Sequence, residues 1–264
     1  MLKQNEIKVG FIGFGNMAQA IADGFLYKET LRADQIYACG GSYEKLCRNT
    51  EARGIFPCRS AEEVAEKSAV IFIAVKPNMV EPVTAPICEK LQGKILISVA
   101  AGMLCEDYDK ILPGTHHLST IPNTPVSTGE GIFITEDTHT LTDEEFAFAK
   151  ELLETISLVK PVTPSQFSIA GTIAGCGPAL TALFVEALGD AGVLHGLSRD
   201  LAYQLASQMI VGTGKMLVSS GMHPGALKDG VCSPGGTTIV GVTTLERKGL
   251  RSTVIDAVDA IETL

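Results

Sequence analysis

The sequence has no excess of positive charge and no membrane-length apolar run among its strand-like segments, and each absence excludes a class of partner. It carries 21 Lys and Arg against 30 Asp and Glu, a formal net charge of −9, whereas binding to nucleic acid needs a concentrated basic face. Apolar segments such as VIFIAV (residues 70–75) and ILISVAAGM (95–103) are too short to cross a bilayer. We therefore expect a small-molecule substrate and neither a nucleic-acid nor a membrane partner.

The chain also lacks a targeting segment and paired cysteines. No basic stretch followed by an apolar one stands at its start, so no signal peptide is predicted and a cytoplasmic location is expected. Its seven cysteines form no C-x-x-C pair, and its five histidines show no metal-ligand spacing. We therefore predict free cysteines that pack as small apolar residues, and no metal site.

The first half of the chain alternates strand and helix signals. Short apolar segments ending in glycine or proline predict strands, and segments with apolar residues three or four apart predict helices. The predicted strands are 8–15, 35–40, 69–77, 94–102, 117–125 and 131–135, and the predicted helices are 16–26, 44–54, 60–68, 86–92 and 142–156. Near-continuous apolar strands separated by helices indicate a parallel sheet covered on both faces. The fold class is thus α/β, with an N-terminal Rossmann-type domain over residues 1–162.

Two prolines in residues 158–166 interrupt the alternation of strands and helices. After about Ser165 the sequence has no further strand signals. Residues 167–197 are small and apolar almost all round, which predicts a buried helix, or two helices broken near GCGP. Ser198 is expected to cap the next helix. We predict an all-α domain over residues 163–264, whose Gly- and Ala-rich helices favour close contact between subunits.

One loop of this helical domain, DGVCSPGGTTIVGV (residues 229–242), places Ser-Pro-Gly-Gly before two threonines. Proline and the glycine pair interrupt helical structure. Thr237 or Thr238 is then expected to cap a new helix, whose free N–H groups attract carboxylates. By itself this pattern also fits an ordinary turn between two helices.

The motif Gly13-x-Gly15-x-x-Ala18 comes directly after the first predicted strand and opens a helix, where a dinucleotide fingerprint belongs. Gly13 permits the tight turn, Gly15 lets the backbone approach a pyrophosphate, and Ala18 lets helix and strand pack closely. The residues expected to contact the cofactor in this turn are Gly13, Phe14, Gly15, Asn16 and Met17.

The residues directly after the second predicted strand favour NADP over NAD. NAD enzymes carry an acid there for the ribose hydroxyls, but this chain has Gly40, Gly41 and Ser42. Ser42 is expected to donate to a 2′-phosphate, with Lys45 or Arg48 supplying positive charge. Both cations also fit a solvated helix face, so NAD is not excluded.

Three further loops are expected at the carboxyl edge of the sheet, where open α/β sheets bind ligands. AVKP supplies Ala74, Val75, Lys76 and Pro77, with the lysine facing the cofactor. VAAG leaves room for a flat nicotinamide beside Ala100, Ala101 and Gly102. In PNTP, prolines on both sides fix the amide of Asn123 at a similar level for a contact.

The chain resembles the pyrroline-5-carboxylate reductase family from about residue 8 to beyond residue 250. The similarity is carried, in order, by GFIGFGNMAQAIADGF (10–25), FIAVKP (72–77), SVAAG (98–102), PNTP (122–125), AGCGPA (174–179) and LKDGVCSPGGTT (227–238). The resemblance implies NAD(P)H-dependent reduction of 1-pyrroline-5-carboxylate to L-proline. It also implies a helical dimerisation domain, with dimers often assembled into a larger ring.

The resemblance further implies roles for the glycine-rich loop of residues 229–242. Its segment from Val231 to Thr238 would wrap the substrate carboxylate, with Thr238 hydrogen-bonded to the ring nitrogen as the catalytic group. The substrate-binding residues expected on this basis are Val231, Ser233, Gly235, Gly236, Thr237 and Thr238. Adjacent glycines that turn their N–H groups inward form a nest for an anion.

The sequence departs from the family at three places. Cys176 stands where a serine is usual, Gly230 replaces an asparagine, and Pro164, Ser165 and Gln166 occupy a region that often holds an acid. A reductase of a related cyclic imine acid, or a non-catalytic NADP-binding paralogue, therefore stays open. A β-hydroxyacid-type dehydrogenase is disfavoured, because residues 167–197 contain no lysine to serve as its general acid.

Overall fold

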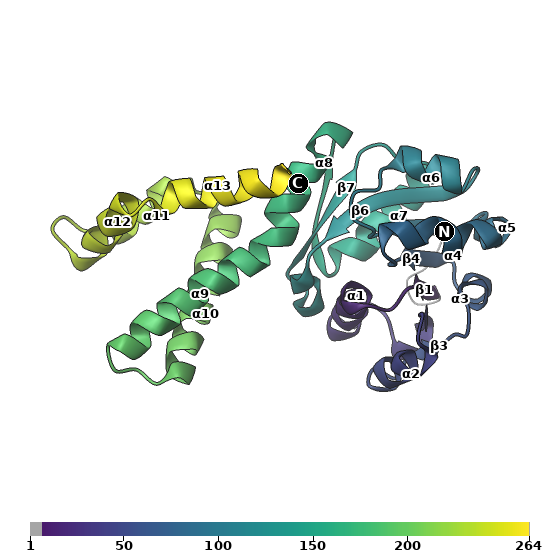
Figure 1. Ribbon diagram of the computed structural model, residues 1–264, viewed down its shortest axis with the longest axis horizontal. Helices are drawn as coiled ribbons and strands as arrows, with labels where there is room; N and C mark the ends of the chain where they lie inside the picture. The colour runs from purple at the N-terminus through teal and green to yellow at the C-terminus, as the bar shows by residue number, and fades with distance from the viewer. Residues whose placement is uncertain (1–6, 264) are drawn as a thin grey trace. The chain divides into compact units, whose positions relative to one another are not determined.

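The structure, a computed structural model, describes residues 7–263. It divides into two compact units, one up to Pro178 and one from Ala179 onward. The first unit contains an eight-stranded sheet with helices, and the described part of the second is helical (Figure 1). The predicted α/β fold with a C-terminal helical region is confirmed. The last strand ends at Val162, and the domain boundary that we place between residues 162 and 163 stays a prediction.

The sheet has the strand order β3-β2-β1-β4-β5-β6-β7-β8. From β1 the chain runs outward to β2 and β3 and then returns to the other side of β1 as β4, so the carboxyl ends of β1 and β4 flank the switch point at which such sheets bind ligands. The strands are β1 (Val9–Ile12), β2 (Ile36–Cys39), β3 (Phe56–Pro57), β4 (Val70–Ile73), β5 (Ile95–Ser98), β6 (His116–Pro122), β7 (Gly131–Glu136) and β8 (Ser157–Val162).

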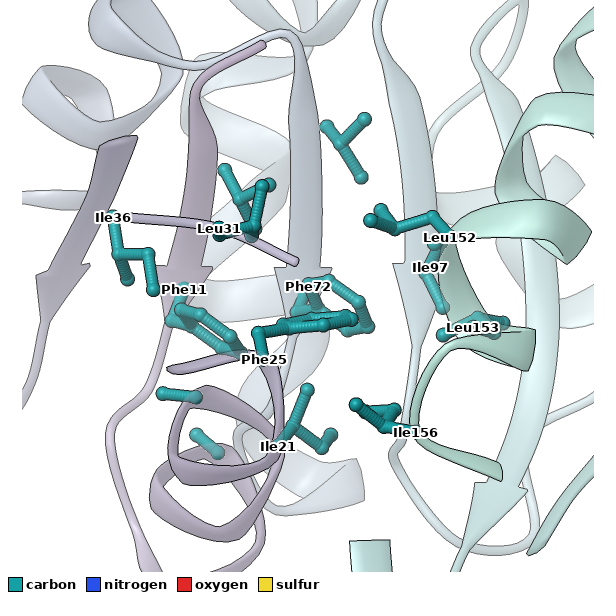
Figure 2. Close-up of a cluster of buried hydrophobic side chains, with 14 of the residues drawn as sticks. Phe11, Ile21, Phe25, Leu31, Ile36, Phe72, Ile97, Leu152, Leu153 and Ile156 are labelled. Carbon is teal, nitrogen blue, oxygen red and sulfur yellow. The ribbon is translucent and has the colours of Figure 1, made fainter. Parts of the chain in front are cut away.

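Successive strand residues enter two different cores, because side chains alternate between the faces of a sheet. Phe11 and Phe72 lie in one core, whereas their neighbours Ile12 and Ile73 lie in the other. In the first core Phe11 and Phe72 stack at 5.0 Å between ring centroids, and Phe25 of the first helix lies 6.0 Å from Phe72 (Figure 2).

Helices cover both of these faces. α1 and α7 contribute buried residues to the core that contains Phe11, and α3, α4, α5 and α6 contribute to the other. The helices of this unit are α1 (Asn16–Tyr27), α2 (Tyr43–Glu51), α3 (Ala61–Lys67), α4 (Pro77–Thr84), α5 (Cys88–Leu91), α6 (Cys105–Ile111), α7 (Asp143–Glu154) and α8 (Pro164–Gly171), with short 3-10 turns η1 (Ala33–Gln35), η2 (Ala85–Ile87) and η3 (Thr124–Thr128).

Two features of the sheet differ from the sequence prediction. β7 runs antiparallel to β6, because the connection over residues 123–130 is too short for the crossover helix that a parallel pair needs. β8 occupies part of the segment in which we predict prolines to interrupt structure. Pro161 is tolerated in it because β8 is the edge strand of the described sheet.

The cysteines behave as predicted, since all seven are free. Burial raises the pKa of Cys39 above its usual value and raises the pKa of Cys58 to about 11. Both thiols therefore stay protonated near neutral pH and pack as small apolar side chains.

The second unit contains most of α9 and all of α10 to α13. Ser198 caps α10 as predicted, its Oγ accepting the N–H of Leu201 at 3.4 Å. α8, the π-helical segment η4 (Thr172–Cys176) and α9 follow one another without interruption, so the helix is not broken near GCGP. The other bounds are α9 (Gly177–Leu194), α10 (Arg199–Ser220), α11 (Pro224–Val231), α12 (Thr237–Arg247) and α13 (Leu250–Glu262).

Within a single chain these helices expose much apolar surface. The run Pro164–Leu194 is long and apolar enough, by length and composition, to cross a membrane, yet only 17% of its apolar window is buried, so our prediction of a buried helix is wrong for the isolated chain. Among the described residues from Ala179 onward, the buried apolar ones are Ala202 and Ala206. An exposed apolar surface of this kind marks an interaction site.

Candidate active site

The loops predicted to hold a dinucleotide leave the sheet at one level. Ile12 lies beside Cys39 on one side and Ile73 on the other, and Ile73 lies beside Ser98. These residues end β1, β2, β4 and β5, which are all parallel. The segments that come after them, containing residues 13–17, Ser42, 74–77 and 100–102, therefore emerge at the same edge of the sheet (Figure 1).

The turn after β1 has the geometry of a dinucleotide fingerprint. Gly13 has a φ of +92°, and its N–H donates to the Cys39 carbonyl at 3.1 Å. A Cβ on Gly13 would lie 2.6 Å from the Ala74 carbonyl oxygen, whereas a Cβ on Gly15 would meet nothing within 4 Å. Gly15 is the N-cap of α1 and has no side chain to cap it. The first N–H groups of α1 are thus open to an anion, and Ala18 is buried against the core, as predicted.

The other three residues of the fingerprint turn differ in how far their side chains are exposed. Phe14 turns its ring into the core, edge-on to Phe11 at 5.8 Å, so its backbone is the part that can face a ligand. Asn16 is exposed and Met17 is half-buried.

The loop after β2 leads directly into α2. Ser42 is the N-cap of α2, and its Oγ accepts the N–H of Lys45 at 3.4 Å. Of the two cations that the sequence offers here, Arg48 is paired with Glu44 at 3.1 Å. The ammonium of Lys45 is exposed and has no carboxylate partner among the described residues. Lys45 is therefore the cation that is available to a ligand at this helix terminus.

Sequence reasoning missed Arg59 at the same terminus. Its guanidinium lies 4.7 Å from the ring centroid of Tyr43, the first residue of α2. Arg59 comes just after β3, which runs parallel to β2, so its position at the carboxyl edge is a consequence of the fold. The sequence contains little indication of this strand, because β3 has two residues, too few for a periodic pattern.

The loops after β4 and β5 complete the edge. The Ala74 N–H donates to the Ile12 carbonyl at 2.8 Å, which holds this loop against the fingerprint turn. Lys76 is exposed at the N-cap of α4, and Pro77 is the first residue of that helix rather than only the end of a strand. Val75, just before Lys76, is half-buried.

The glycine that closes the VAAG loop, Gly102, has a φ of +76°. Ala100 is buried, and its N–H donates to the Ser98 hydroxyl at 3.2 Å. Ala101 is exposed. Small residues therefore face the edge at this point.

Asn123 directly follows β6, the next strand of the sheet after β5. Ser119 is the β6 residue beside Ser98, and Asn123 comes four residues farther along the chain. Asn123 is buried, with its Oδ1 accepting the N–H of Ile132 at 2.8 Å and its Nδ2 donating to the Ala174 carbonyl at 3.1 Å. β6 extends past β5 to pair with β7, and our expectation that Asn123 lies at a level similar to that of the other loops stays a prediction. A direct contact between Asn123 and the cofactor stays a prediction.

The hydrogen bond from the Asn123 amide to the Ala174 carbonyl is explained by Pro178, which has no N–H to donate to that carbonyl. In an α-helix the N–H of residue 178 would donate to the carbonyl of residue 174, but proline has no N–H. The helix is π-helical over Thr172–Cys176 just before this proline. The Asn123 amide thus gives the buried Ala174 carbonyl a donor in place of the N–H that Pro178 lacks.

A double-mutant cycle tests this pairing. We expect Asn123→Ala to lower the free energy of unfolding by about 2 kcal/mol, because it leaves buried polar groups unpaired. In a Pro178→Ala background the loss should be smaller, since residue 178 then has an N–H of its own to donate. Urea unfolding of the four proteins measures the coupling, and equal losses in both backgrounds would contradict the explanation.

In the second unit, the glycine-rich loop lies between α11 and α12. Gly235 has a φ of +67°, and the N–H of Gly236 donates to the Ser233 carbonyl at 3.0 Å. This turn makes Gly236 the N-cap of α12, without a side-chain cap. The prediction that Thr237 or Thr238 caps the helix is therefore wrong, because both threonines are already inside it.

The start of α12 is open to solvent in the isolated chain. Thr238 is exposed, and its hydroxyl bonds to no residue that the structure describes. Val231, Ser233, Gly235 and Thr237 are exposed as well. The N-terminal N–H groups of α12 and the Thr238 hydroxyl are thus presented together, an arrangement that suits a small anion.

Comparison with known proteins agrees with both halves of the chain. Residues 164–263 match the family described as pyrroline-5-carboxylate reductase dimerisation, and residues 8–102 match that described as NADP oxidoreductase, coenzyme F420-dependent. The pyrroline-5-carboxylate reductase of Treponema pallidum is 46% identical over 96% of this chain and 98% of its own length. The chain belongs to the pyrroline-5-carboxylate reductase family.

Other members of the pyrroline-5-carboxylate reductase family support this. The reductase of Arabidopsis thaliana is 38% identical, covering 96% of this chain and 92% of its own length. A crystal structure of Plasmodium falciparum pyrroline carboxylate reductase with NADP bound has a TM-score of 0.86 and 32% identity, covering 97% of this chain and 96% of that one.

Membership confirms the resemblance drawn from the sequence motifs and identifies the protein as an NAD(P)-dependent oxidoreductase. It also gives the exposed helices a partner. The apolar run Pro164–Leu194 opens the family's dimerisation region, so a second chain accounts for its exposed surface without a membrane.

Proposed function

We propose that the protein reduces 1-pyrroline-5-carboxylate to L-proline, the last step of proline synthesis, with hydride passing from nicotinamide C4 to the imine carbon. The observation that carries this proposal is the 46% identity to a pyrroline-5-carboxylate reductase over nearly the full length of both chains. A cytoplasmic location and a ring of dimers belong to the same proposal, and the dimerisation region supports the dimer.

The residues at the sheet edge fit a dinucleotide. Gly13 adopts a conformation that other residues rarely reach, and the space beside Gly15 is open up to the uncapped start of α1. In our proposal residues 13–17 hold the pyrophosphate, residues 74–77 and 100–102 line the nicotinamide, and Lys76 faces the cofactor. When bound, a reduced nicotinamide supplies the hydride.

NADP is the cofactor that the loop after β2 favours. No acid stands directly after β2 to bind ribose hydroxyls, and Ser42 offers a hydroxyl at the start of α2. Lys45 is free of carboxylates among the described residues, and Arg59 lies on Tyr43 beside the same terminus. We propose that Ser42 and Lys45 bind the 2′-phosphate, with Arg59 adding positive charge.

The glycine-rich loop of the second unit would bind the substrate. Its N–H groups at Gly235, Thr237 and Thr238 suit the carboxylate, because the start of α12 has no cap of its own. Thr238 would hydrogen-bond the ring nitrogen, which must be protonated or hydrogen-bonded as its carbon accepts hydride. Val231, Ser233 and Gly236 shape the loop. The rate would then come from alignment and charge rather than from covalent chemistry.

Oxidation of NADPH followed by absorbance tests the proposal. We expect oxidation that depends on added 1-pyrroline-5-carboxylate, with a lower KM for NADPH than for NADH. In the same assay Lys45→Ala should raise the KM for NADPH about tenfold, the loss of one charge-assisted contact, and leave that for NADH unchanged. Arg48→Ala, which removes the cation paired with Glu44, is the matched control. No turnover with this imine would exclude the function.

A further inference from the structure

A cysteine and an aspartate of α6 lie close to a histidine of β6. Cys105 and Asp109 lie one turn apart on α6, and His117 lies on β6. The His117 Nε2 is 3.5 Å from the Cys105 Sγ and 3.5 Å from the Asp109 Oδ1. One potential ligand atom from each of the three residues lies within 4.8 Å of the other two.

These separations match a tetrahedral zinc site. With zinc bonded to sulfur at about 2.3 Å and to nitrogen or oxygen at about 2.0 Å, tetrahedral ligand atoms lie roughly 3.3 to 3.6 Å apart. Both measured distances from His117 fall in this range. A metal ion could therefore contact Nε2 and both of these atoms at once, with the Cys105 sulfur and the Asp109 oxygen within 4.8 Å of each other.

Hydrogen bonding around the imidazole leaves room for a cation. The Thr115 hydroxyl donates its one hydrogen to the Leu112 carbonyl at 2.8 Å. It therefore accepts from His117, whose Nδ1 is 3.2 Å away, and this assigns the ring proton to Nδ1. The lone pair of Nε2 then faces the Cys105 thiol at 3.5 Å, with the Cys105 carbonyl oxygen at 3.2 Å. A metal-bound histidine shows the same pattern, with its other nitrogen donating to a fixed partner.

Two of the three side chains are buried and the third is open to solvent, so a cation could enter the cluster and be held there. Cys105 and His117 are almost fully buried, whereas the side chain of Asp109 is 57% exposed and opens the cluster to solvent. The buried carboxylate of Glu136 accepts the Cys105 N–H at 2.7 Å. The negative charge of Asp109 and Glu136 would offset that of a divalent ion.

We propose that Cys105, Asp109 and His117 bind one zinc ion, with water or the Cys105 carbonyl oxygen as the fourth ligand. The thiolate is the coordinating form, so binding releases the Cys105 proton to solvent. Sequence spacing predicts no metal site, because only the fold brings β6 beside α6. Since α6 comes directly after the loop of residues 99–104, a bound ion would fasten one end of the nicotinamide loop to the sheet.

Titration of the full-length, reduced protein with Co²⁺ tests the site, because cobalt bound by a thiolate gives a charge-transfer absorption band that zinc then displaces. We expect one equivalent to bind and the melting temperature to rise with added Zn²⁺. Cys105→Ser should remove the band. Cys58→Ser, at a buried cysteine outside the cluster, should retain it.

Asp109→Asn provides a second test that does not depend on the core, because this side chain is largely exposed. It should weaken Co²⁺ binding at least about tenfold without lowering the melting temperature of the metal-free protein. Absence of the band in the unaltered protein, or its persistence in Cys105→Ser, would overturn the proposal. So would equal affinity in Asp109→Asn.

Discussion

Gly13→Ala should destabilise the protein itself, by about 2 to 3 kcal/mol, before any cofactor is involved. The φ of +92° at this position is one that alanine avoids. In addition, the new Cβ would lie 2.6 Å from the Ala74 carbonyl oxygen and 2.8 Å from a methyl group of Val75. Because the nearer of these atoms belongs to the Ala74 backbone, rotating the Val75 side chain would not relieve the clash. Urea unfolding without nucleotide measures the loss.

Gly15→Ala is the matched comparison. Gly15 has a φ of −79°, and a Cβ there would meet nothing within 4 Å, so stability should be unchanged. The same Cβ would occupy the space through which the backbone approaches a pyrophosphate. We therefore expect the dissociation constant for NADPH to rise at least about tenfold by calorimetry. Unchanged NADPH affinity in Gly15→Ala would show that the dinucleotide does not bind at this turn.

Thr238→Ala should reduce kcat about a hundredfold or more, the loss of one positioned hydrogen-bond donor at a reacting centre. The residue is exposed at the second position of α12, and its hydroxyl bonds to no other described residue. Its replacement should therefore leave the helix and the melting temperature unaltered. Steady-state oxidation of NADPH with 1-pyrroline-5-carboxylate gives kcat and KM separately.

Two variants separate the hydroxyl from the helix that carries it. Thr238→Ser keeps the hydroxyl and should retain most of the activity. Thr244→Ala removes a threonine from the same helix whose hydroxyl donates to the Val240 carbonyl at 2.8 Å, and it should have full activity. If Thr238→Ala turns over at the normal rate, the ring nitrogen takes its hydrogen bond from elsewhere.

Much of the Rossmann unit could be predicted from the sequence because its signals are local. Apolar strands that end in glycine or proline identified β1, β2, β4 and β5, and the glycine fingerprint placed the start of α1. Thr142 caps α7 through a bond from the Glu145 N–H to its Oγ at 3.3 Å, as a capping pattern predicts. Ser60 and Glu63 have the same spacing at the start of α3, but the box there is only half formed. Ser60 accepts the Glu63 N–H, whereas Glu63 accepts from the Arg59 N–H instead of that of Ser60.

The features that the sequence could not predict depend on partners far along the chain. The prolines near residue 161 suggested an interruption, because nothing local says that β8 is an edge strand. The bond from Asn123 to Ala174 joins residues 51 positions apart, and its cause, the missing N–H of Pro178, becomes visible only once the helix is known to continue. Arg59 and the cluster around His117 likewise depend on which strands lie side by side.

The small apolar interior of the helical unit has a consequence for how this enzyme matures. Ala202 and Ala206 are its buried apolar residues from Ala179 onward, while larger side chains such as Val218, at 86% exposed, remain in water. We therefore expect a newly synthesised chain to bury this surface against a second copy, which would make completion of the helical unit a bimolecular event. At low expression, the encounter of two chains rather than the strength of either one would limit how much working enzyme a cell holds.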